Sequence, residues 1–259
     1  MVIVVIININ DEIREKLTIS EELVVKYINE NESKLANMSI VEIAEETFTS
    51  TATVSRAIKK CGVNGFMELR YTLSKKDNEE NESKDINEIF NKSLIETRQT
   101  IENLSVNKVV DVLNLIRKSK RIVVLARGLS ELVSKEFTLK LQLMDFNVFN
   151  INDLNIMKKI SKDSSKGEVY IIFTLKGVAE ELIISARNAQ KSGAKVVVCC
   201  CGISKELAKY ADHVILGYKH SNISIKKYEV TSRIPLFIIS RAILDYLVMD
   251  LERKKDIKK

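Results

Sequence analysis

Several residue types that define common protein classes are scarce in this sequence. Its 259 residues include no tryptophan, one proline, two histidines and four cysteines. The single proline argues against long proline-rich disordered segments. Three of the cysteines are adjacent, at Cys199, Cys200 and Cys201, and the fourth is Cys61, so no pair has the CxxC spacing. This pattern fits neither a disulfide framework nor a structural zinc site, and we expect buried, reduced thiols with no metal and no cofactor.

The sequence also lacks an apolar run long enough to cross a membrane. Its opening, MVIVVIININ, is apolar but turns charged at Asp11. A membrane-spanning helix needs about 20 apolar residues, and a signal peptide needs a basic start and a cleavage site of small residues. We interpret the opening as a strand or the lead-in to a first helix, and we expect a cytoplasmic protein without membrane contact.

The remaining composition is that of a globular protein with surplus positive charge. Hydrophobic residues make up 45% and charged residues 29%, and the net charge is +6. The length favours two domains. A basic balance is compatible with binding to nucleic acid, but many basic proteins bind none, so the charge alone does not decide the function.

A first short helix is predicted in the segment MSIVEIAEET. Ile40, Ile43 and Ala44 recur at three- and four-residue spacing, which gives the helix one apolar face. Ser39 can cap its start, and Glu42 three residues later can complete a capping box.

A second helix follows in FTSTATVSRAIKKCG, where Thr49 or Ser50 can cap the start and Gly62 can end the helix. Its predicted buried stripe consists of Val54, Ala57, Ile58 and Cys61. Its predicted outer surface offers hydroxyls and cations, at Ser50, Thr51, Thr53, Ser55, Arg56, Lys59 and Lys60. A recognition helix needs such a division, with Arg56 and the hydroxyls near base edges and the lysines near phosphates. A solvated basic helix in a small bundle would show the same pattern, so both interpretations stay open.

Strand-like and helical segments alternate in the second half of the chain. The continuous apolar runs are RIVVLA from Arg121, NVFNI from Asn147, VYIIFT from Val169, KVVVCC from Lys195 and HVIL from His213. Such runs are typical of parallel strands buried on both faces, and the helices between them indicate a doubly wound α/β sheet. A last helix is expected from about Tyr228 to Leu251, with Pro235 near its first turns as a potential kink.

The predicted architecture therefore has two domains, an all-α helix-turn-helix bundle followed by a doubly wound parallel α/β domain. We place the DNA-binding bundle at residues 1–76 and the α/β domain at 119–259. Between them, residues 77–118 hold a polar linker, Lys75–Asp85, and two connecting helices around Ile86–Leu104 and Val106–Lys118.

Glycines follow two of the predicted strands where helices begin. A glycine at a helix start lets an anion approach free backbone N–H groups. The candidate anion-binding residues at these strand ends are Arg127, Gly128, Ser130, Thr174, Lys176 and Gly177. Ordinary tight turns would look the same, and this alternative stays open.

The segment from Leu17 to about Lys76 resembles the helix-turn-helix domain of the MurR/RpiR regulator family. The shared features are a Leu-Thr helix start, a Met-Ser-Ile-x-Glu-Ile-Ala helix and a Thr-Val-x-Arg recognition helix. A Gly-(x)2-Gly-Phe-x-Glu-Leu motif follows them, here Gly62, Gly65, Phe66, Glu68 and Leu69. The resemblance implies a transcriptional regulator that binds double-stranded DNA.

The region from about Arg121 to Leu251 resembles the SIS (sugar isomerase) domain, the usual partner of this helix-turn-helix domain. Gly128 and Ser130 match its Gly-x-Gly-x-Ser motif, and Thr174 and Gly177 match its Ser-x-Ser-Gly-x-Thr motif. The departures from the two motifs are Ala126, Lys176 and Ala179. Lys176 either supplies a charge to the same phosphate, or the pocket has drifted to another anion or lost its ligand.

The combined resemblance implies a homodimer or homotetramer that reads a palindromic operator and responds to a phosphorylated sugar, with Glu229 near the effector. Two alternatives remain. A sugar-phosphate isomerase would need a positioned base, and neither His213 nor His220 lies at a convincing strand end. The second alternative is a SIS scaffold that binds no ligand and only brings two DNA-binding domains together.

Overall fold

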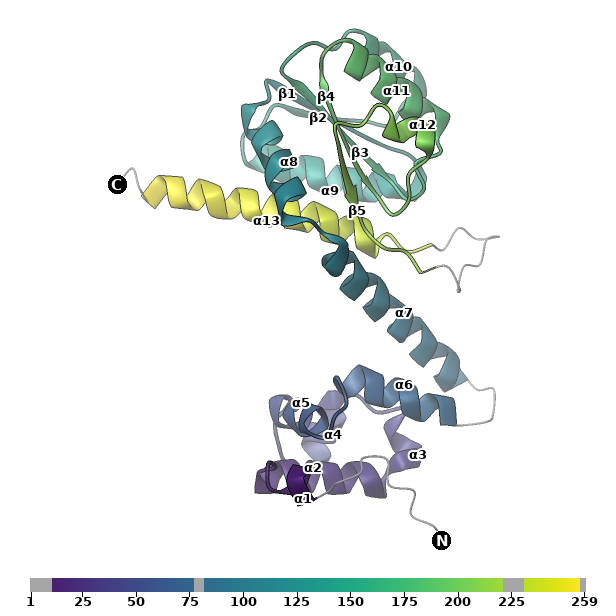
Figure 1. Cartoon of the computed structure of the whole chain (residues 1–259), viewed down its shortest axis with the longest axis vertical. Helices are drawn as coiled ribbons and strands as arrows, with labels where there is room; N and C mark the ends of the chain where they lie inside the picture. The colour runs from purple at the N-terminus through teal and green to yellow at the C-terminus, as the bar shows by residue number, and fades with distance from the viewer. Residues whose placement is uncertain (1–10, 77–81, 221–230, 257–259) are drawn as a thin grey trace. The chain divides into compact units, whose positions relative to one another are not determined.

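The computed structural model describes residues 11–76, 82–220 and 231–256 (Figure 1). The chain divides into two compact units, Met1–Leu94 and Ile95–Lys259. The boundary falls inside one helix, α7 (Glu82–Asn103), within the range expected to connect the domains. The domain limits 1–76, 77–118 and 119–259 therefore stay a prediction.

Unit 1 is helical throughout its described part. Its helices are α1 (Asp11–Arg14), α2 (Ile19–Glu30), α3 (Glu32–Leu35), α4 (Ile40–Glu46), α5 (Thr51–Lys60), α6 (Phe66–Lys76) and the first part of α7. Apolar side chains from α2 to α6 form one core, which includes Val24, Val25 and Ile28 of α2 and Val54, Ala57 and Ile58 of α5. The amide of Asn87 in α7 donates a hydrogen bond to the carbonyl of Ala36, at 2.9 Å, which ties α7 to this bundle.

Unit 2 is built around a five-stranded parallel sheet in the order β2-β1-β3-β4-β5. The strands are β1 (Arg121–Ala126), β2 (Val148–Ile151), β3 (Glu168–Thr174), β4 (Lys195–Cys200) and β5 (His213–Leu216). β1 and β3 are neighbours with Ala126 opposite Phe173. The chain winds outwards in both directions from this pair, so the strand order reverses between β1 and β3.

Helices cover both faces of the sheet (Figure 1). One face packs against α8 (Val106–Lys118), α9 (Glu131–Leu143) and α13 (Ile234–Asp256). The other packs against α10 (Leu154–Lys162), α11 (Glu180–Lys191) and α12 (Lys205–Ala208). Neighbouring residues alternate between the two cores, so Val124 lies in the first and Val123 and Leu125 in the second. Strands buried on both faces explain the continuous apolar runs in the sequence.

The structure confirms the doubly wound sheet and corrects some details. The last helix begins at Ile234, and Thr231–Arg233 are not helical, so the expected start near Tyr228 is wrong for these three residues. Pro235 is the second residue of α13. Backbone N–H groups in the first turn of a helix have no acceptor within the helix, so a proline there breaks no hydrogen bond and need not kink the helix as expected. The alternation of strands and helices was predicted, but α10 and α12 were not assigned residue ranges from the sequence.

Two further expectations concern the chain between and before the domains. Helices occupy both ends of the polar Lys75–Asp85 stretch, because α6 ends at Lys76 and α7 begins at Glu82. The apolar opening of the chain lies outside the described residues. No helix in the described ranges is long and apolar enough to span a membrane.

Candidate nucleic-acid interface and effector site

Helices α4 and α5 form a pair whose ends are specified by capping side chains. Ser39 and Glu42 form the predicted capping box, with N–H to oxygen distances of 3.2 and 2.6 Å. Ser50, rather than Thr49, caps α5, because its hydroxyl accepts a hydrogen bond from the Thr53 N–H at 3.1 Å. These caps fix the turn that joins the two helices.

Gly62 terminates α5, as the sequence predicted, two residues after the last helical residue, Lys60. Gly62 has a positive φ of 85°. Its N–H donates to the Lys59 carbonyl, and the next N–H, of Val63, donates to the Ile58 carbonyl. This pair of bonds is the Schellman arrangement, which favours glycine because the residue adopts a left-handed conformation.

Helix α5 separates apolar from polar residues as predicted. Val54, Ala57 and Ile58 are completely buried in the unit 1 core, and Cys61 packs against it. Ser50, Thr51, Arg56, Lys59 and Lys60 are exposed, and Thr53 and Ser55 are half-buried. The seven candidate DNA-binding residues therefore all retain contact with solvent on one short helix and its cap.

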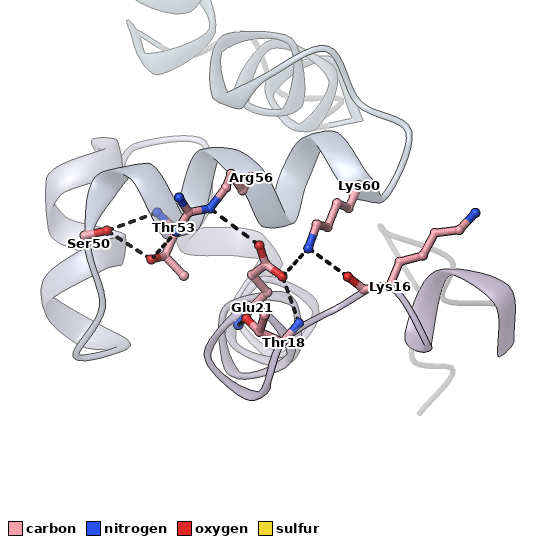
Figure 2. A network of polar contacts seen from close by, with 7 residues as sticks. All are labelled: Lys16, Thr18, Glu21, Ser50, Thr53, Arg56 and Lys60. Carbon is pink, nitrogen blue, oxygen red and sulfur yellow. Dashed lines mark hydrogen bonds and ion pairs between the residues drawn. The ribbon is translucent and has the colours of Figure 1, made fainter.

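A buried carboxylate lies beneath the basic side of α5, as Figure 2 shows. Glu21 of α2 is only 2% exposed. Its Oε2 accepts hydrogen bonds from the Thr18 N–H at 2.8 Å and the Lys60 ammonium at 2.7 Å. Its Oε1 lies 3.6 Å from Nε of Arg56. Sequence reasoning missed Glu21, although Thr18 and Glu21 have the spacing of a capping box.

The hydrogen bonds to Glu21 lower its pKa by more than burial raises it. Desolvation works to raise the pKa of Glu21, but hydrogen bonds from Lys60 and Thr18 lower it, and the net pKa is below the ordinary value. The carboxylate is therefore ionised in the folded protein at neutral pH. A buried charge of this kind is tolerable only with such partners.

The remaining cations of α5 have looser contacts. The guanidinium of Arg56 donates from Nη2 to the Thr53 hydroxyl at 3.4 Å, and its side chain is 63% exposed (Figure 2). Among the ion pairs of the described residues, Lys59 has no partner, and its side chain faces solvent. Lys59 is thus the α5 cation most available to an external anion.

The candidate effector residues lie at the carboxyl ends of β1 and β3. Ligands of open parallel sheets bind beyond the carboxyl ends of the strands, at the point where the strand order reverses. In this sheet that point lies between β1 and β3. The fold brings together the predicted groups that follow these two strands, Arg127–Ser130 and Thr174–Gly177.

The turn after β1 is partly occupied by the chain's own carboxylate. Gly128 has a positive φ of 59°, and its N–H donates to Oε1 of Glu131 at 3.1 Å. Arg127 donates to the Asn152 carbonyl at 3.2 Å and lies 3.9 Å from the Glu131 carboxylate. Ser130 is buried. An incoming anion at this turn would compete with Glu131 for the Gly128 N–H.

The turn after β3 is tighter and requires its glycine. The hydroxyl of Thr174 accepts a hydrogen bond from the Gly177 N–H at 3.1 Å, and the Gly177 carbonyl accepts one from Ser204 at 2.6 Å. Gly177 has a φ of 64°, and a Cβ there would lie 3.0 Å from the Cα of Ile203. Lys176 is exposed beside it. Only glycine fits this position without a shift of backbone.

Helix α11 starts immediately after this turn without a capping side chain. Ala179 occupies the N-cap and makes no side-chain hydrogen bond. The first N–H groups of a helix have no partner within the helix and attract anions. The departure from the SIS motif at Ala179 therefore leaves these backbone donors without a side-chain acceptor.

The other candidate groups give no second site. Glu229 lies outside the described residues. His213 opens β5 at the amino end of the strand, 3.9 Å from Asp111, and the backbone N–H of His220 donates to the carboxylate of the buried Glu96. In the described ranges, no three histidine, cysteine or acidic side chains form a metal-binding group.

The cysteines are free thiols in unreactive surroundings. Cys199 and Cys200 are buried in β4, as expected, while Cys61 and Cys201 are partly exposed. Burial raises the pKa of Cys200 to about 11, so this thiol is protonated at neutral pH. A protonated, buried thiol is a poor nucleophile and a poor metal ligand.

Comparisons with known proteins match both units. Residues 6–80 match the helix-turn-helix domain of the rpiR family, and residues 115–239 match the SIS domain. An uncharacterized HTH-type transcriptional regulator of Clostridium perfringens (strain 13 / Type A) is 25% identical over 234 residues, which cover 85% of this chain and 84% of that protein.

Solved structures share the fold. The Vibrio vulnificus NanR protein complexed with ManNAc-6P matches with a TM-score of 0.60 and 17% identity, over 95% of this chain and 93% of that one. The sugar isomerase domain of an RpiR transcription factor from Sphaerobacter thermophilus matches with a TM-score of 0.56 and 13% identity, over 66% of this chain and 96% of that one. The chain therefore carries a helix-turn-helix domain of the rpiR family followed by a SIS domain.

Proposed function

We propose that the protein is a transcriptional regulator that binds double-stranded DNA through α5 and responds to a phosphorylated sugar bound by its SIS domain. The observation that carries this proposal is the division of α5. One side is packed into the bundle, and the other presents only hydroxyls, small side chains and cations. A major groove accepts a helix with such a surface. The role is regulatory and not catalytic, and such a regulator acts in the cytoplasm.

The proposed DNA contacts divide by chemistry. The hydroxyls of Ser50, Thr51, Thr53 and Ser55 lie in the cap and first half of α5, where a recognition helix meets base edges, and Arg56 follows them in the middle of the helix. Lys59 and Lys60 lie in its last turn and have the charge for phosphates. Paired α5 helices in a homodimer or homotetramer would read two half-sites of a palindrome about one helical turn apart.

The proposed effector site is the strand-order reversal between β1 and β3. The turns there supply Arg127, Gly128, Ser130, Thr174, Lys176 and Gly177, and we include Glu229 from the sequence motif. The uncapped start of α11 offers backbone N–H donors at the β3 turn, and the exposed Lys176 ammonium adds a positive charge beside it. Glu180 and Glu181 in the first turn of α11 oppose an anion there, so the proposal depends on Lys176 to offset them. At the β1 turn, Glu131 would have to release the Gly128 N–H. The proposal therefore places the phosphate nearer to the β3 turn.

Two titrations test this function. The purified protein is titrated against DNA from upstream of its own gene and against scrambled DNA of equal length at the same salt. The proposal predicts binding to the upstream DNA that is about a thousandfold tighter. Equal affinity for both DNAs would contradict the proposal that the protein is a sequence-specific transcriptional regulator. Thermal unfolding with a panel of sugar phosphates tests the effector, because a ligand specific to the folded state raises the melting temperature.

A further inference from the structure

Among the described residues, Glu21 is the acidic side chain that contacts the basic face of α5. It projects from α2, and its carboxylate bridges the N-terminus of α2 and two cations of α5 (Figure 2). A solvent-exposed ion pair would exchange freely with water, but Glu21 is 2% exposed. Its position is therefore fixed by the packing of α2 against α5.

The three cations of α5 differ in how strongly other groups of the protein hold them. The Lys60 ammonium uses two of its three N–H donors within the protein, because it donates to Glu21 at 2.7 Å and to the Lys16 carbonyl at 2.7 Å. Arg56 is only oriented, between Glu21 at Nε and Thr53 at Nη2, and stays largely exposed. Lys59 has no such contact in the described part of the chain.

Because Lys60 and Arg56 are held differently, they should also differ in how readily they contact DNA. A phosphate competes with a buried carboxylate for the Lys60 ammonium, and a Lys60 side chain drawn outwards would leave that carboxylate without its main counter-charge. Arg56 can meet a base while its Nε stays near Glu21, because its side chain is largely exposed and Nη2 has only the 3.4 Å contact with the Thr53 hydroxyl. An arginine held in one orientation loses less conformational entropy when it binds a guanine edge.

We propose that Glu21 is a positioning residue that sets the sequence selectivity of α5, by orienting Arg56 towards base edges and by withholding Lys60 from phosphates. This inference rests on the proposed DNA-binding function. It changes the role of Lys60 from a phosphate contact to part of an internal clamp. It also assigns a function to a carboxylate that would otherwise oppose binding to a polyanion.

The direct test is Glu21→Gln. Glutamine keeps the length of the side chain and an oxygen for the Thr18 N–H, since capping boxes use Glu or Gln at this position. It removes the charge that holds Lys60, so Lys60 becomes available to one phosphate. For scrambled DNA, the slope of log affinity against log salt should steepen by about 0.9, and affinity at about 0.15 M salt should rise about fivefold. The affinity ratio between upstream and scrambled DNA should fall severalfold.

Two variants separate this mechanism from a general effect of charge. Glu22→Gln removes the same charge from the next residue of α2, whose carboxylate lies 3.9 Å from Arg14 and not against α5. It should leave the salt slope unchanged. In the double variant Glu21→Gln/Lys60→Gln, the added slope should disappear, because Lys60 is its source.

Glu21→Asp provides a second approach should the glutamine variant unfold. It retains the charge but shortens the reach towards Lys60, and it should steepen the slope in the same direction by less than Glu21→Gln. A wild-type protein that prefers upstream DNA, together with an unchanged slope and ratio in both Glu21 variants, overturns the inference alone. An equal change in Glu22→Gln also overturns it. No sequence preference in the wild type overturns the proposed function, and the inference with it.

Discussion

Arg56 and Lys59 lie within one turn of each other on α5 but have different surroundings, and we expect different roles. Arg56→Ala should lower affinity for upstream DNA by about tenfold and affinity for scrambled DNA much less, because a bidentate arginine–guanine contact contributes about 1–3 kcal/mol of discrimination. Lys59→Ala should weaken both and flatten the salt slope by about 0.9. Equal losses on both DNAs for Arg56→Ala would remove Arg56 from base readout.

Lys176 is the most informative residue of the proposed effector site, because it replaces a serine of the SIS motif. If its ammonium contacts the phosphate, Lys176→Ala should weaken binding of the effector about tenfold, the effect of one charge-assisted hydrogen bond. Calorimetric titration with the sugar phosphate found by thermal unfolding measures this change. Lys191→Ala, at the opposite end of α11, is the matched control. Unchanged affinity in Lys176→Ala would show that the lysine does not reach the ligand.

At the scale of single residues, the sequence predicted outward polar groups better than contacts between them. The exposure of Arg56 and Lys59 follows from helical periodicity, since both are offset from the apolar stripe. The contact between Lys60 and Glu21 does not follow from it, because the two lie 39 residues apart and meet only when α2 packs against α5. The hydrogen bond from the Gly128 N–H to the Glu131 carboxylate could not be predicted either, because the sequence motif specifies the glycine and the serine but not Glu131.

Among the elements, α5 depends on its cap more than on its intrinsic helix propensity. It has only 10 residues, too few for a stable isolated helix. Ser50→Ala removes the oxygen that accepts the Thr53 N–H and should cost about 1 kcal/mol, a fall of about 4 °C in the melting temperature of a domain of this size. Ser55→Ala, on the same helix but away from the cap, should cause no such fall. Differential scanning calorimetry compares the two variants, and equal stability would argue against the cap.

The contact between α2 and α5 should depend on pH through Glu21. Its pKa is lowered in the folded protein from the ordinary value of 4.5. A lowered carboxyl pKa contributes stability that is present above the unfolded pKa and is lost as the pH falls through the folded pKa. Between about pH 5 and about pH 3, the melting temperature of the wild type should therefore fall more steeply than that of Glu21→Gln. Parallel curves for the two proteins would contradict a stabilising role for the ionised carboxylate.

Elements with a strong pattern were predicted closely from the sequence, and weakly patterned ones were not. β1 and β4 coincide with the apolar runs RIVVLA and KVVVCC, because strands buried on both faces leave no polar interruption. The edge strand β5 coincides with HVIL, although only Ile215 in it is buried. The α12 helix has only four residues, too few to show a helical period. The start of α13 was misplaced because its capping region carries no apolar pattern.

At the scale of the whole molecule, a helix-turn-helix unit and a SIS unit are parts of one chain, and the boundary between the two compact units falls inside α7. An effector can alter DNA binding only if it binds the DNA-bound and the free state with different affinity. By the same linkage, specific DNA must change the affinity for the effector by an equal factor. The sequence predicted the two parts through family motifs, but it contains no information on the sign of this coupling.

The most direct test of the account is a titration of the protein with its own upstream DNA and with scrambled DNA, each with and without a panel of sugar phosphates at constant salt. The account predicts selective binding to the upstream DNA, and a shift of about 5- to 150-fold in that affinity with one sugar phosphate. Affinity that is the same for both DNAs, with no sugar phosphate altering it, would contradict the account.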